Sequence, residues 1–502
     1  MQSRLQCRSR GCPMADVVLD GRSLTPRALL AIGAGASVSL CPEARARMTE
    51  SASWLADGPD ADVIHAKWSW LSGRSAPSEG SDTVRVFLED HCAGVGEPLA
   101  PDVVRAVMAA RANALAIGVS GARPAVVDTL LAMLEADVVP VVPELGSVGA
   151  AGSAALAHIA LVACGYGGEA WVAGMRMAGP EAMEGLPVLS PTEKDALSLI
   201  NGSTLATVLA AYAVERARTV LQTFDEAAAL SCEVVRANLG AFSARAQEAR
   251  RHDGGQRVAA LVRDRVAGSS LVTVRRRTDA FSIRCLPAVH GAAWDAHAYV
   301  ESTVSRELNA AVDNPLVFPG HGVVEAGTFH GAPVGLVADH LKAALTQVAG
   351  ISERRIFRLT YAQLSGLPSF LVPDSGVNSG LMLAQYTAAS VVSEAKAMCH
   401  PASVDSVPVV QHHEDHVSMA SVAARSALRV VDLVADVAAI ELLCGAQGLD
   451  LRLEQGETPG GGTRLTWQRV RQHVDRWIED RELHPDLSAL GEAVRAGAFA
   501  PS

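Results

Sequence analysis

The sequence lacks the features that mark several common classes of protein. Its nine cysteines show neither the paired spacing of a zinc knuckle nor a disulfide framework, so we expect a reduced, cytoplasmic protein without a metal. No apolar run is long enough and free enough of charge to span a membrane. With a formal net charge of -11 and dispersed basic residues, the chain is not expected to bind nucleic acid.

Aromatic residues are also scarce, at 4% of the chain, whereas alanine and leucine abound in long segments without proline. This pattern predicts helices. Glycine and proline in VVPVVPELGSVG predict a rigid irregular loop, after which Ser153 can cap a helix that runs to about Cys164. The expected helices cover residues 101–118, 124–136, 205–250, 291–312, 333–359, 381–398 and 417–444.

The expected domain organisation follows from these segments. Residues 1–13 are polar and precede Met14, so we expect a disordered or mis-started extension. An N-terminal domain would cover 14–200, a central bundle of long helices 201–445, and a charged, amphipathic helical tail 446–502. Several of the long helices are apolar on most faces, as expected at the centre of a bundle.

Several motifs occur in a fixed order along the chain. They include RANALAIGVSGARP from Arg111, GSVGAAG from Gly146, KDALSLINGST from Lys194, DAFSIRCLPAVHG from Asp279, ELNAAVDNPLVF from Glu307, GTFHG from Gly327 and EDHVSM from Glu414. Together they resemble the aromatic amino-acid ammonia-lyases, the histidine and phenylalanine enzymes. The resemblance implies an all-α fold, a homotetramer with active sites built from more than one subunit, and a small-molecule carboxylate substrate.

The tripeptide Ala150-Ala151-Gly152 stands where this family has Ala-Ser-Gly. In the family the tripeptide cyclises and dehydrates to a methylidene-imidazolone, an electrophile whose methylene comes from the serine. Ala151 has no hydroxyl to lose, and Ser153 and Ala155 stand where the family usually has Asp and Pro. We therefore expect the prosthetic group to be absent.

The resemblance also places a catalytic tyrosine near residues 63–71, where this chain reads VIHAKWSWL. His65 or Lys67 can substitute as a base, although both also suit a loop or surface position. Trp68 and Trp70 can wall a pocket or simply pack.

A second motif, TDAFSIR, keeps only part of the family's pattern. Arg284 matches the arginine that holds the substrate carboxylate, a task that suits its bidentate fork, although a salt bridge at a helix end is the alternative. Phe281 replaces a second tyrosine and loses its hydroxyl, and Thr278 replaces a glutamine. We expect Phe281 and Thr278 to line the substrate site.

Four further residues match pocket positions of the family. His91 matches a histidine that faces the substrate side chain, Asn201 an asparagine beside the electrophile and the amino group, and Phe329 a pocket aromatic. Glu414 matches a glutamate typical of the histidine-type members, and a carboxylate near apolar walls can serve as acid or base.

His412 and His413 stand where the family usually has Asn-Gln. His412 and His416 would share a helical face if the helix began early enough, and a metal site is then conceivable. The full metal motif is missing, so we expect His412 and His413 to line the pocket and hold no metal.

These observations lead to a main hypothesis and two alternatives. The main hypothesis is a divergent enzyme that lacks the electrophile and catalyses an acid/base elimination, isomerisation or cyclisation of an unsaturated or aromatic carboxylic substrate in a specialised biosynthetic pathway. His91, Glu414, Asn201 and Arg284 would be its catalytic residues. The alternatives are a non-catalytic binding or regulatory homologue of an active lyase, and a residual amino-acid ammonia-lyase.

Overall fold

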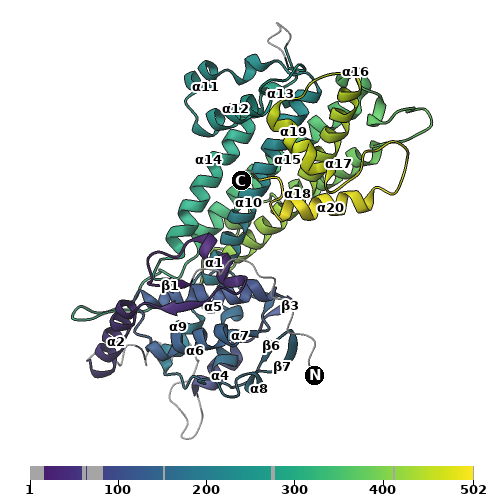
Figure 1. Ribbon diagram of the computed structural model, residues 1–502. Helices are drawn as coiled ribbons and strands as arrows, with labels where there is room; N and C mark the ends of the chain where they lie inside the picture. Colours follow the sequence, from purple (N-terminus) through teal and green to yellow (C-terminus); the bar gives the residue numbers. More distant parts are fainter. Residues whose placement is uncertain are drawn as a thin grey trace. The chain divides into compact units, whose positions relative to one another are not determined.

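The computed structural model describes residues 16–58, 64, 83–150, 153–272, 278–410 and 413–500. These residues form two compact units, each assembled from three separate stretches of the chain (Figure 1). Unit 1 comprises residues up to Tyr212 together with Glu301–Leu336 and Ala402–Arg425, and unit 2 comprises Ala213–Val300, Val337–Pro401 and Ser426–Ser502. The expected boundaries at residues 200 and 445 differ from this division and stay a prediction.

Unit 1 contains helices of short and medium length and, among the described residues, all the strands. Its helices are α1 (Pro26–Gly33), α2 (Pro42–Asp57), α4 (Thr83–Asp90), α5 (Pro101–Ala116), α6 (Pro124–Glu135), α7 (Ala154–Ala163), α8 (Gly179–Ala182), α9 (Glu193–Ile200) and the 3-10 turn η3 (Ala402–Val404). Its strands are β1 (Val17–Leu19), β2 (Val38–Leu40), β3 (Val95–Pro98), β4 (Val138–Pro140), β5 (Pro143–Leu145), β6 (Glu169–Val172), β7 (Met175–Ala178), β8 (Leu316–Phe318) and β9 (Gly322–Val324).

Helix α5 runs through the core of unit 1. Pro101 occupies its first turn, where the missing N–H costs nothing, and nearly every residue from Val103 onward is buried. Helix α6 likewise begins with a proline, and α9 begins with a capping box between Thr192 and Asp195. The expected helices at 101–118 and 124–136 are thus confirmed.

The strands are short and form four small sheets. Strands β1 and β2 pair in parallel, β3 pairs with β5, β4–β6–β7 form a three-stranded antiparallel sheet, and β8 pairs with β9. The segment VVPVVPELGSVG, expected to be an irregular loop, therefore contains β4, whose valines pair with β6, and β5, which pairs with β3.

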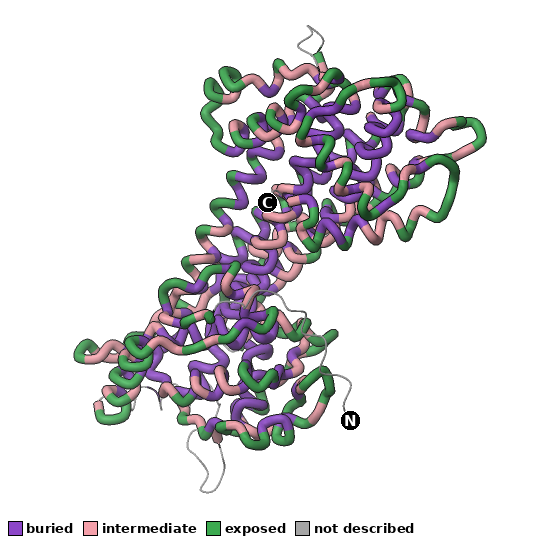
Figure 2. Tube along the Cα trace, viewed as in Figure 1, coloured by how far each residue is buried: buried purple, intermediate pink, exposed green. Residues whose placement is uncertain are grey.

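Long helices form most of unit 2. They are α10 (Thr204–Val234), α14 (Leu286–Glu307), α15 (Ala332–Thr360) and α18 (Ala420–Glu454), whose first turns or last turns belong to unit 1. The shorter elements are α11 (Ala244–Arg250), α12 (Asp253–Arg265), α13 (Phe281–Arg284), α16 (Ala362–Ser365), α17 (Met382–Ala397), α19 (Gly461–Arg471), α20 (His484–Arg495), and the 3-10 turns η1 (Leu239–Phe242) and η2 (Ser369–Leu371). The long helices are buried along much of their length (Figure 2).

Two of the expected helices were wrong in length. The helix expected over 205–250 ends at Val234, because Arg236 adopts a left-handed conformation (φ 58°) and Asn238 then caps η1. The helix expected to end at Cys444 continues to Glu454 through two glycines. A Cβ at Gly448 would lie 2.6 Å from a methyl of Val234, so this glycine permits close packing of α18 on α10 rather than ending α18.

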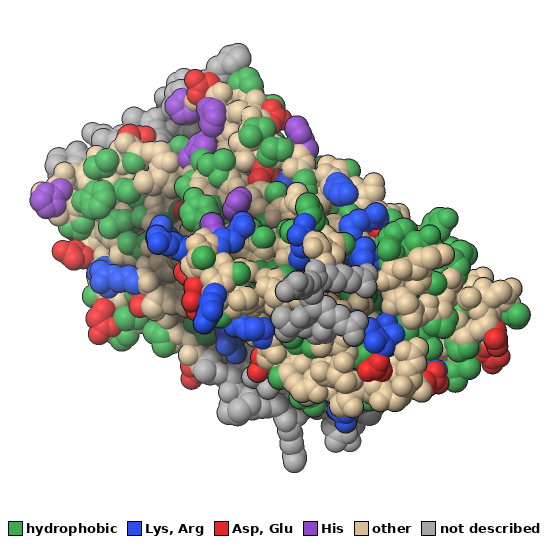
Figure 3. All heavy atoms as spheres, turned by 90° about the horizontal axis from the view of Figure 1, so that it is seen from above, with side chains coloured by type: hydrophobic (Ala, Val, Ile, Leu, Met, Phe, Trp, Pro, Cys, Tyr) green, Lys and Arg blue, Asp and Glu red, His purple; other side chains and the backbone are tan. Residues whose placement is uncertain are grey.

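The most apolar long stretch comprises α9 and α10 and lies in the core. Within the described residues only Glu193–Val234 is long and apolar enough to cross a membrane by composition, and all of its most apolar window is buried inside the protein. On the face shown in Figure 3, basic and acidic side chains are interspersed rather than gathered in a continuous basic field.

Candidate functional site

Asn201, at the C-terminal end of α9, is held by its side-chain amide. Its Nδ2 donates to Asp313 Oδ1 (3.1 Å) and to the carbonyl oxygen of Asn314 (2.9 Å). Its Oδ1 is buried and has no hydrogen-bond partner within the part of the chain that the structure describes. An unpaired buried acceptor is costly, so its presence in a folded protein indicates a site that receives a donor.

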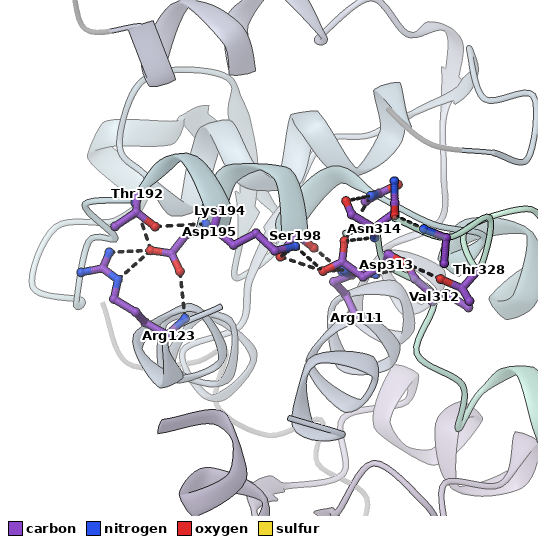
Figure 4. Close-up of polar contacts among 12 residues, drawn as sticks. Arg111, Arg123, Thr192, Lys194, Asp195, Ser198, Val312, Asp313, Asn314 and Thr328 are labelled. Carbon is purple, nitrogen blue, oxygen red and sulfur yellow. Dashed lines mark hydrogen bonds and ion pairs between the residues drawn. The ribbon is translucent and has the colours of Figure 1, made fainter. Parts of the chain in front are cut away.

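Asp313 is the centre of a buried polar cluster in unit 1 (Figure 4). Its Oδ2 accepts from Lys194 Nζ (3.0 Å) and Ser198 Oγ (2.7 Å), and the guanidinium of Arg111 lies 3.8 Å away. Burial by itself raises the pKa of Asp313, but the charges of Lys194 and Arg111 and the hydrogen bonds outweigh it and lower the pKa to about 2. The carboxylate is therefore ionised at all ordinary pH values.

The loop that precedes the Ala-Ala-Gly tripeptide is tightly enclosed. Gly149 has a φ of 79°, and a Cβ there would lie 2.5 Å from Ser418 Oγ and 2.7 Å from the backbone nitrogen of Ala420. The carbonyl oxygen of Gly149 accepts from Ser418 Oγ (2.6 Å) and from the N–H of Gly331 (2.9 Å). Segments far apart in sequence thus fix the entry to the tripeptide.

Ser153 follows the tripeptide and joins it to Asn201. Its backbone N–H donates to the carbonyl of Ile200 (2.9 Å), the residue before Asn201. Ser153 occupies the N-cap position of α7, as expected, but its side chain makes no capping hydrogen bond, and its buried Oγ has no partner among the described residues. Ser153 Oγ and Asn201 Oδ1 are thus two buried oxygens without a partner among the described residues, and the Ser153–Ile200 hydrogen bond joins the segments that carry them.

His91 lies just after α4, in a segment that packs against the same loop. Its Nδ1 lies 2.8 Å from the carbonyl oxygen of Phe87, and its ring contacts the ring of Phe87 at a centroid distance of 4.2 Å. Three residues later, Gly94 lies against the loop, since a Cβ on Gly146 would be 3.2 Å from the Gly94 Cα. The structure therefore places the segment that follows His91 beside the loop.

Glu414 lies in an irregular segment before α18. Burial raises its pKa, and the neighbouring His413 partly offsets the effect. The rings of His416 and His330 stack at 5.3 Å, which brings this segment to the turn that contains Phe329. Helix α18 begins only at Ala420, so His416 does not lie on a helical face as the metal alternative required.

Arg284, Phe281 and Thr278 belong to unit 2. Phe281 and Arg284 form the ends of the four-residue helix α13, and the Arg284 guanidinium lies over the Phe281 ring at 4.7 Å. Thr278 is exposed, and Phe281 is 67% exposed. The exposed position of Arg284 leaves its guanidinium accessible to an anion.

Several of the candidate residues lie outside the described residues. They are Ala151, Gly152, His412, His65, Lys67, Trp68, Trp70 and the extension 1–13. Ala150 is described and is buried.

The family model for "Aromatic amino acid lyase" matches residues 24–472. The chain belongs to the aromatic amino acid lyase family. This confirms the family resemblance and the helical fold, and it makes the protein a member of a family of enzymes.

Several of the relatives in sequence are histidine ammonia-lyases. A histidine ammonia-lyase of Caldanaerobacter subterraneus subsp. tengcongensis is 42% identical over 496 residues, covering 96% of this chain and 97% of its own. One of Geobacillus kaustophilus is 45% identical over 421 residues, covering 82% and 83%. The crystal structure of histidine ammonia-lyase from Trypanosoma cruzi superposes with a TM-score of 0.87 at 36% identity, covering 97% of this chain and 94% of that one.

These relatives correct two expectations. The hypothesis of a divergent lyase that works on another carboxylic substrate is wrong, because nearly full-length relatives at about 42% identity are histidine ammonia-lyases. The expectation that the methylidene-imidazolone is absent is contradicted by the same relatives. The expectation about the prosthetic group relied on the tripeptide and its flanking residues, and the hypothesis about function relied also on the two missing tyrosines, whereas the similarity extends over nearly the whole chain.

The residues around the tripeptide fit such a group, but position 151 does not. Gly149 has no room for a Cβ, and the buried oxygens of Asn201 and Ser153 have no partner within the described ranges, so both features suit a compact polar group in this loop. Residue 151 is alanine, whose methyl group carries no hydroxyl that dehydration could remove. The surrounding residues thus fit a methylidene-imidazolone, whereas the tripeptide lacks the hydroxyl from which the group forms.

Sequence analysis missed the residues that hold Asn201. Lys194 and Ser198 lie in the quoted motif KDALSLINGST, and Asp313 and Asn314 lie in ELNAAVDNPLVF, yet only Asn201 was singled out. The sequence did offer a signal for this cluster: Lys194 and Asp313 lie within largely apolar segments, and an ionised group that is buried there needs a partner.

Proposed function

We propose that this lyase acts on L-histidine and releases ammonia. In this reaction the bond between Cα and the amino nitrogen breaks, a proton leaves Cβ, and a double bond forms between the two carbons, conjugated with the imidazole ring. The observation that carries the proposal is the buried Oδ1 of Asn201, which has no partner in the described part of the chain and follows the residue that accepts from the Ser153 N–H. The histidine ammonia-lyases among the relatives support the choice of substrate.

We assign the remaining contacts by chemistry. The exposed guanidinium of Arg284 is suited to hold the substrate carboxylate through two hydrogen bonds. Glu414, a half-buried carboxylate, is suited to accept the N–H of the imidazole, a contact that a phenyl ring cannot make. His91 and Phe329 would complete the walls around the ring.

The same proposal includes assembly and location. Members of the family are typically homotetramers, and we propose a cytoplasmic homotetramer whose active sites combine residues from several copies. The exposed apolar side chains of Leu336, Leu383 and Tyr386 on α15 and α17 support an interface there. Light scattering should give four times the chain mass, and a stable monomer at micromolar concentration would contradict the assembly.

The experiment measures ammonia release from L-histidine and L-phenylalanine by the parent protein, with the ultraviolet absorbance of the conjugated acid as a second readout. We expect both signals with histidine and neither with phenylalanine. Intact-mass measurement of the same sample reports the state of the tripeptide, and the Ala151→Ser variant measures how far turnover depends on residue 151. Absence of ammonia from histidine with the correctly assembled parent would refute the proposal.

A second candidate function is supported by Ala151. A homologue that binds the amino acid without converting it would keep the polar contacts around Asn201 while lacking the serine hydroxyl. Histidine binding by the parent, detected by calorimetry and unaccompanied by ammonia release, would favour this candidate over the lyase.

A further inference from the structure

We propose that Asp313 is a positioning residue that fixes the orientation of the Asn201 amide, so that Asn201 presents only a hydrogen-bond acceptor to the amino group of the substrate. The proposal rests on the function proposed above and specifies how the site recognises an amine. It assigns the buried cluster of Lys194, Ser198 and Asp313 a role in ligand selection.

The contacts of Asn201 permit one amide orientation. Nδ2 has two hydrogens, and the acceptors Asp313 Oδ1 and the Asn314 carbonyl take them at 3.1 Å and 2.9 Å. A flipped amide would place Oδ1 against a carboxylate oxygen and a carbonyl oxygen, which are both acceptors. It would lose two hydrogen bonds and create repulsion between like partial charges. The network therefore determines which amide atom is free.

The acceptor character of Asp313 is itself fixed from the other side. Lys194 Nζ and Ser198 Oγ both donate to Oδ2, while Oδ1 accepts from the backbone N–H of Asn314 (2.7 Å) as well as from Asn201. The four groups that hydrogen-bond to the carboxylate are all donors, and Lys194 and Arg111 supply compensating charge. Asp313 thus stays ionised and cannot donate to Asn201.

The free atom decides what the site can recognise. Asn201 Oδ1 is an acceptor with no partner among the described residues, and both amide hydrogens are already used. Asn201 can therefore satisfy an N–H donor but cannot donate to an oxyanion or a carbonyl. An amino group, which offers N–H donors, is the part of an amino acid that meets this requirement.

The test replaces Asp313 by asparagine and compares two ligands. In Asp313→Asn, Lys194 attracts the new amide oxygen to the Oδ2 side, so the new NH₂ group faces Asn201 in place of an acceptor, and only the Asn314 carbonyl still opposes the flipped amide. Calorimetry should then show about tenfold weaker binding of L-histidine, equivalent to one hydrogen bond to a charged group. The affinity for the desamino analogue, imidazolyl propanoate, should change by less than about twofold, because the analogue has no amino group that could lose its contact with Asn201.

Ser198→Ala is the matched control. It removes a donor to Asp313 Oδ2 and so perturbs the same cluster, but it leaves the Oδ1–Asn201 contact in place. Its ratio of histidine affinity to desamino-analogue affinity should equal that of the parent. An equal loss for both ligands in Asp313→Asn, or a change of the ratio in Ser198→Ala, would overturn the proposal.

A measurement on the parent protein keeps the proposal testable if Asp313→Asn does not fold. The Nα-trimethyl derivative of histidine keeps the positive charge and has no N–H on that nitrogen. We expect the parent to bind histidine at least about tenfold more tightly than this derivative and than the desamino analogue. Equal affinities, or no binding of any of the three, would overturn the proposal.

Failure of the proposed function remains distinguishable. Amine-selective binding that depends on Asp313, without ammonia release, would support the orienting role and refute the lyase activity. Ammonia release with an unchanged ligand ratio in Asp313→Asn would support the activity and refute the orienting role.

Discussion

Arg355 on α15 and Glu441 on α18 form a two-point ion pair that is fully buried in unit 2. Nε lies 2.6 Å from Oε1 and Nη2 lies 2.8 Å from Oε2, and both side chains are 0% exposed. Ser231 and Ser352 donate to the same carboxylate at 2.7 Å and 2.6 Å. Arg355 Nη1 also reaches the carbonyl of Ser282 in α13 (3.4 Å), so this pair supports the helix that carries Arg284.

The Glu441→Gln substitution should destabilise the protein strongly. It leaves the Arg355 guanidinium buried without a countercharge, and breaking a buried pair in this way costs about 3–5 kcal/mol. The measurement is the free energy of unfolding from denaturant titration. Asp436→Asn is the control, because its partner Arg495 is 38% exposed and an exposed pair contributes less than about 1 kcal/mol. Similar losses in the two variants would contradict the importance of burial.

Gly149→Ala should be much more harmful than Gly174→Ala. Both glycines have a φ of 79°, so the backbone strain of an alanine, about 1 kcal/mol, is common to both variants. Only at Gly149 would the new Cβ collide, at 2.5 Å from Ser418 Oγ, whereas nothing lies within 4 Å at Gly174. We expect Gly149→Ala to lower stability by at least about 2 kcal/mol more in thermal unfolding. Equal effects would show that the loop is not enclosed.

Acid should remove the contribution of Asp313. The folded state lowers the pKa of Asp313, so its carboxylate stabilises the protein at pH values above the unfolded pKa of 3.8. This contribution to the free energy of unfolding is lost as the pH falls toward about 2. The difference amounts to about 2 kcal/mol at neutral pH. At neutral pH the free energy of unfolding of Asp313→Asn should be lower than that of the parent protein. Between pH values of about 4 and 2 it should change less than that of the parent. Asp128→Asn, which alters an exposed pair with Arg45, should keep the parental profile.

Glu414→Gln should affect histidine more than a ligand without an imidazole. The substituted glutamine keeps the shape of the side chain but loses the charge that strengthens a hydrogen bond from the imidazole N–H, so we expect about a tenfold rise in KM or Kd for histidine. Phenylalanine binding should not weaken. Asp415→Asn is the control, because Asp415 is adjacent and exposed. An unchanged histidine affinity in Glu414→Gln would remove Glu414 from the substrate site.

Local sequence signals predicted individual helices well where turn chemistry governs the ends. Prolines at the first turns of α5 and α6, and Gly118 after α5, marked these helices correctly. Glycine also predicted that the last long helix would end before Gly445, but α18 continues through Gly445 and Gly448. A glycine can end a helix, or it can lie inside one and permit close packing against a neighbour. Only the neighbouring Leu230 and Val234 distinguish the two cases.

The candidate site was predicted in part. Asn201 was identified from its motif, but the residues that orient its amide were not, because Asp313 lies 112 residues away in sequence. The enclosure of Gly149 likewise depends on Ser418 and Gly331, which no local pattern connects with it.

The sequence by itself determined the helical class, the family and the alanine at position 151, since each depends on residue types and their order. Tertiary structure alone decided which atoms of the site are free. Hydrogen-bond partners are assigned in three dimensions, and an amide becomes an acceptor or a donor only when distant groups occupy its other end. In this protein Asp313 and Asn314 occupy the Asn201 NH₂ group and leave its oxygen unpaired among the described residues.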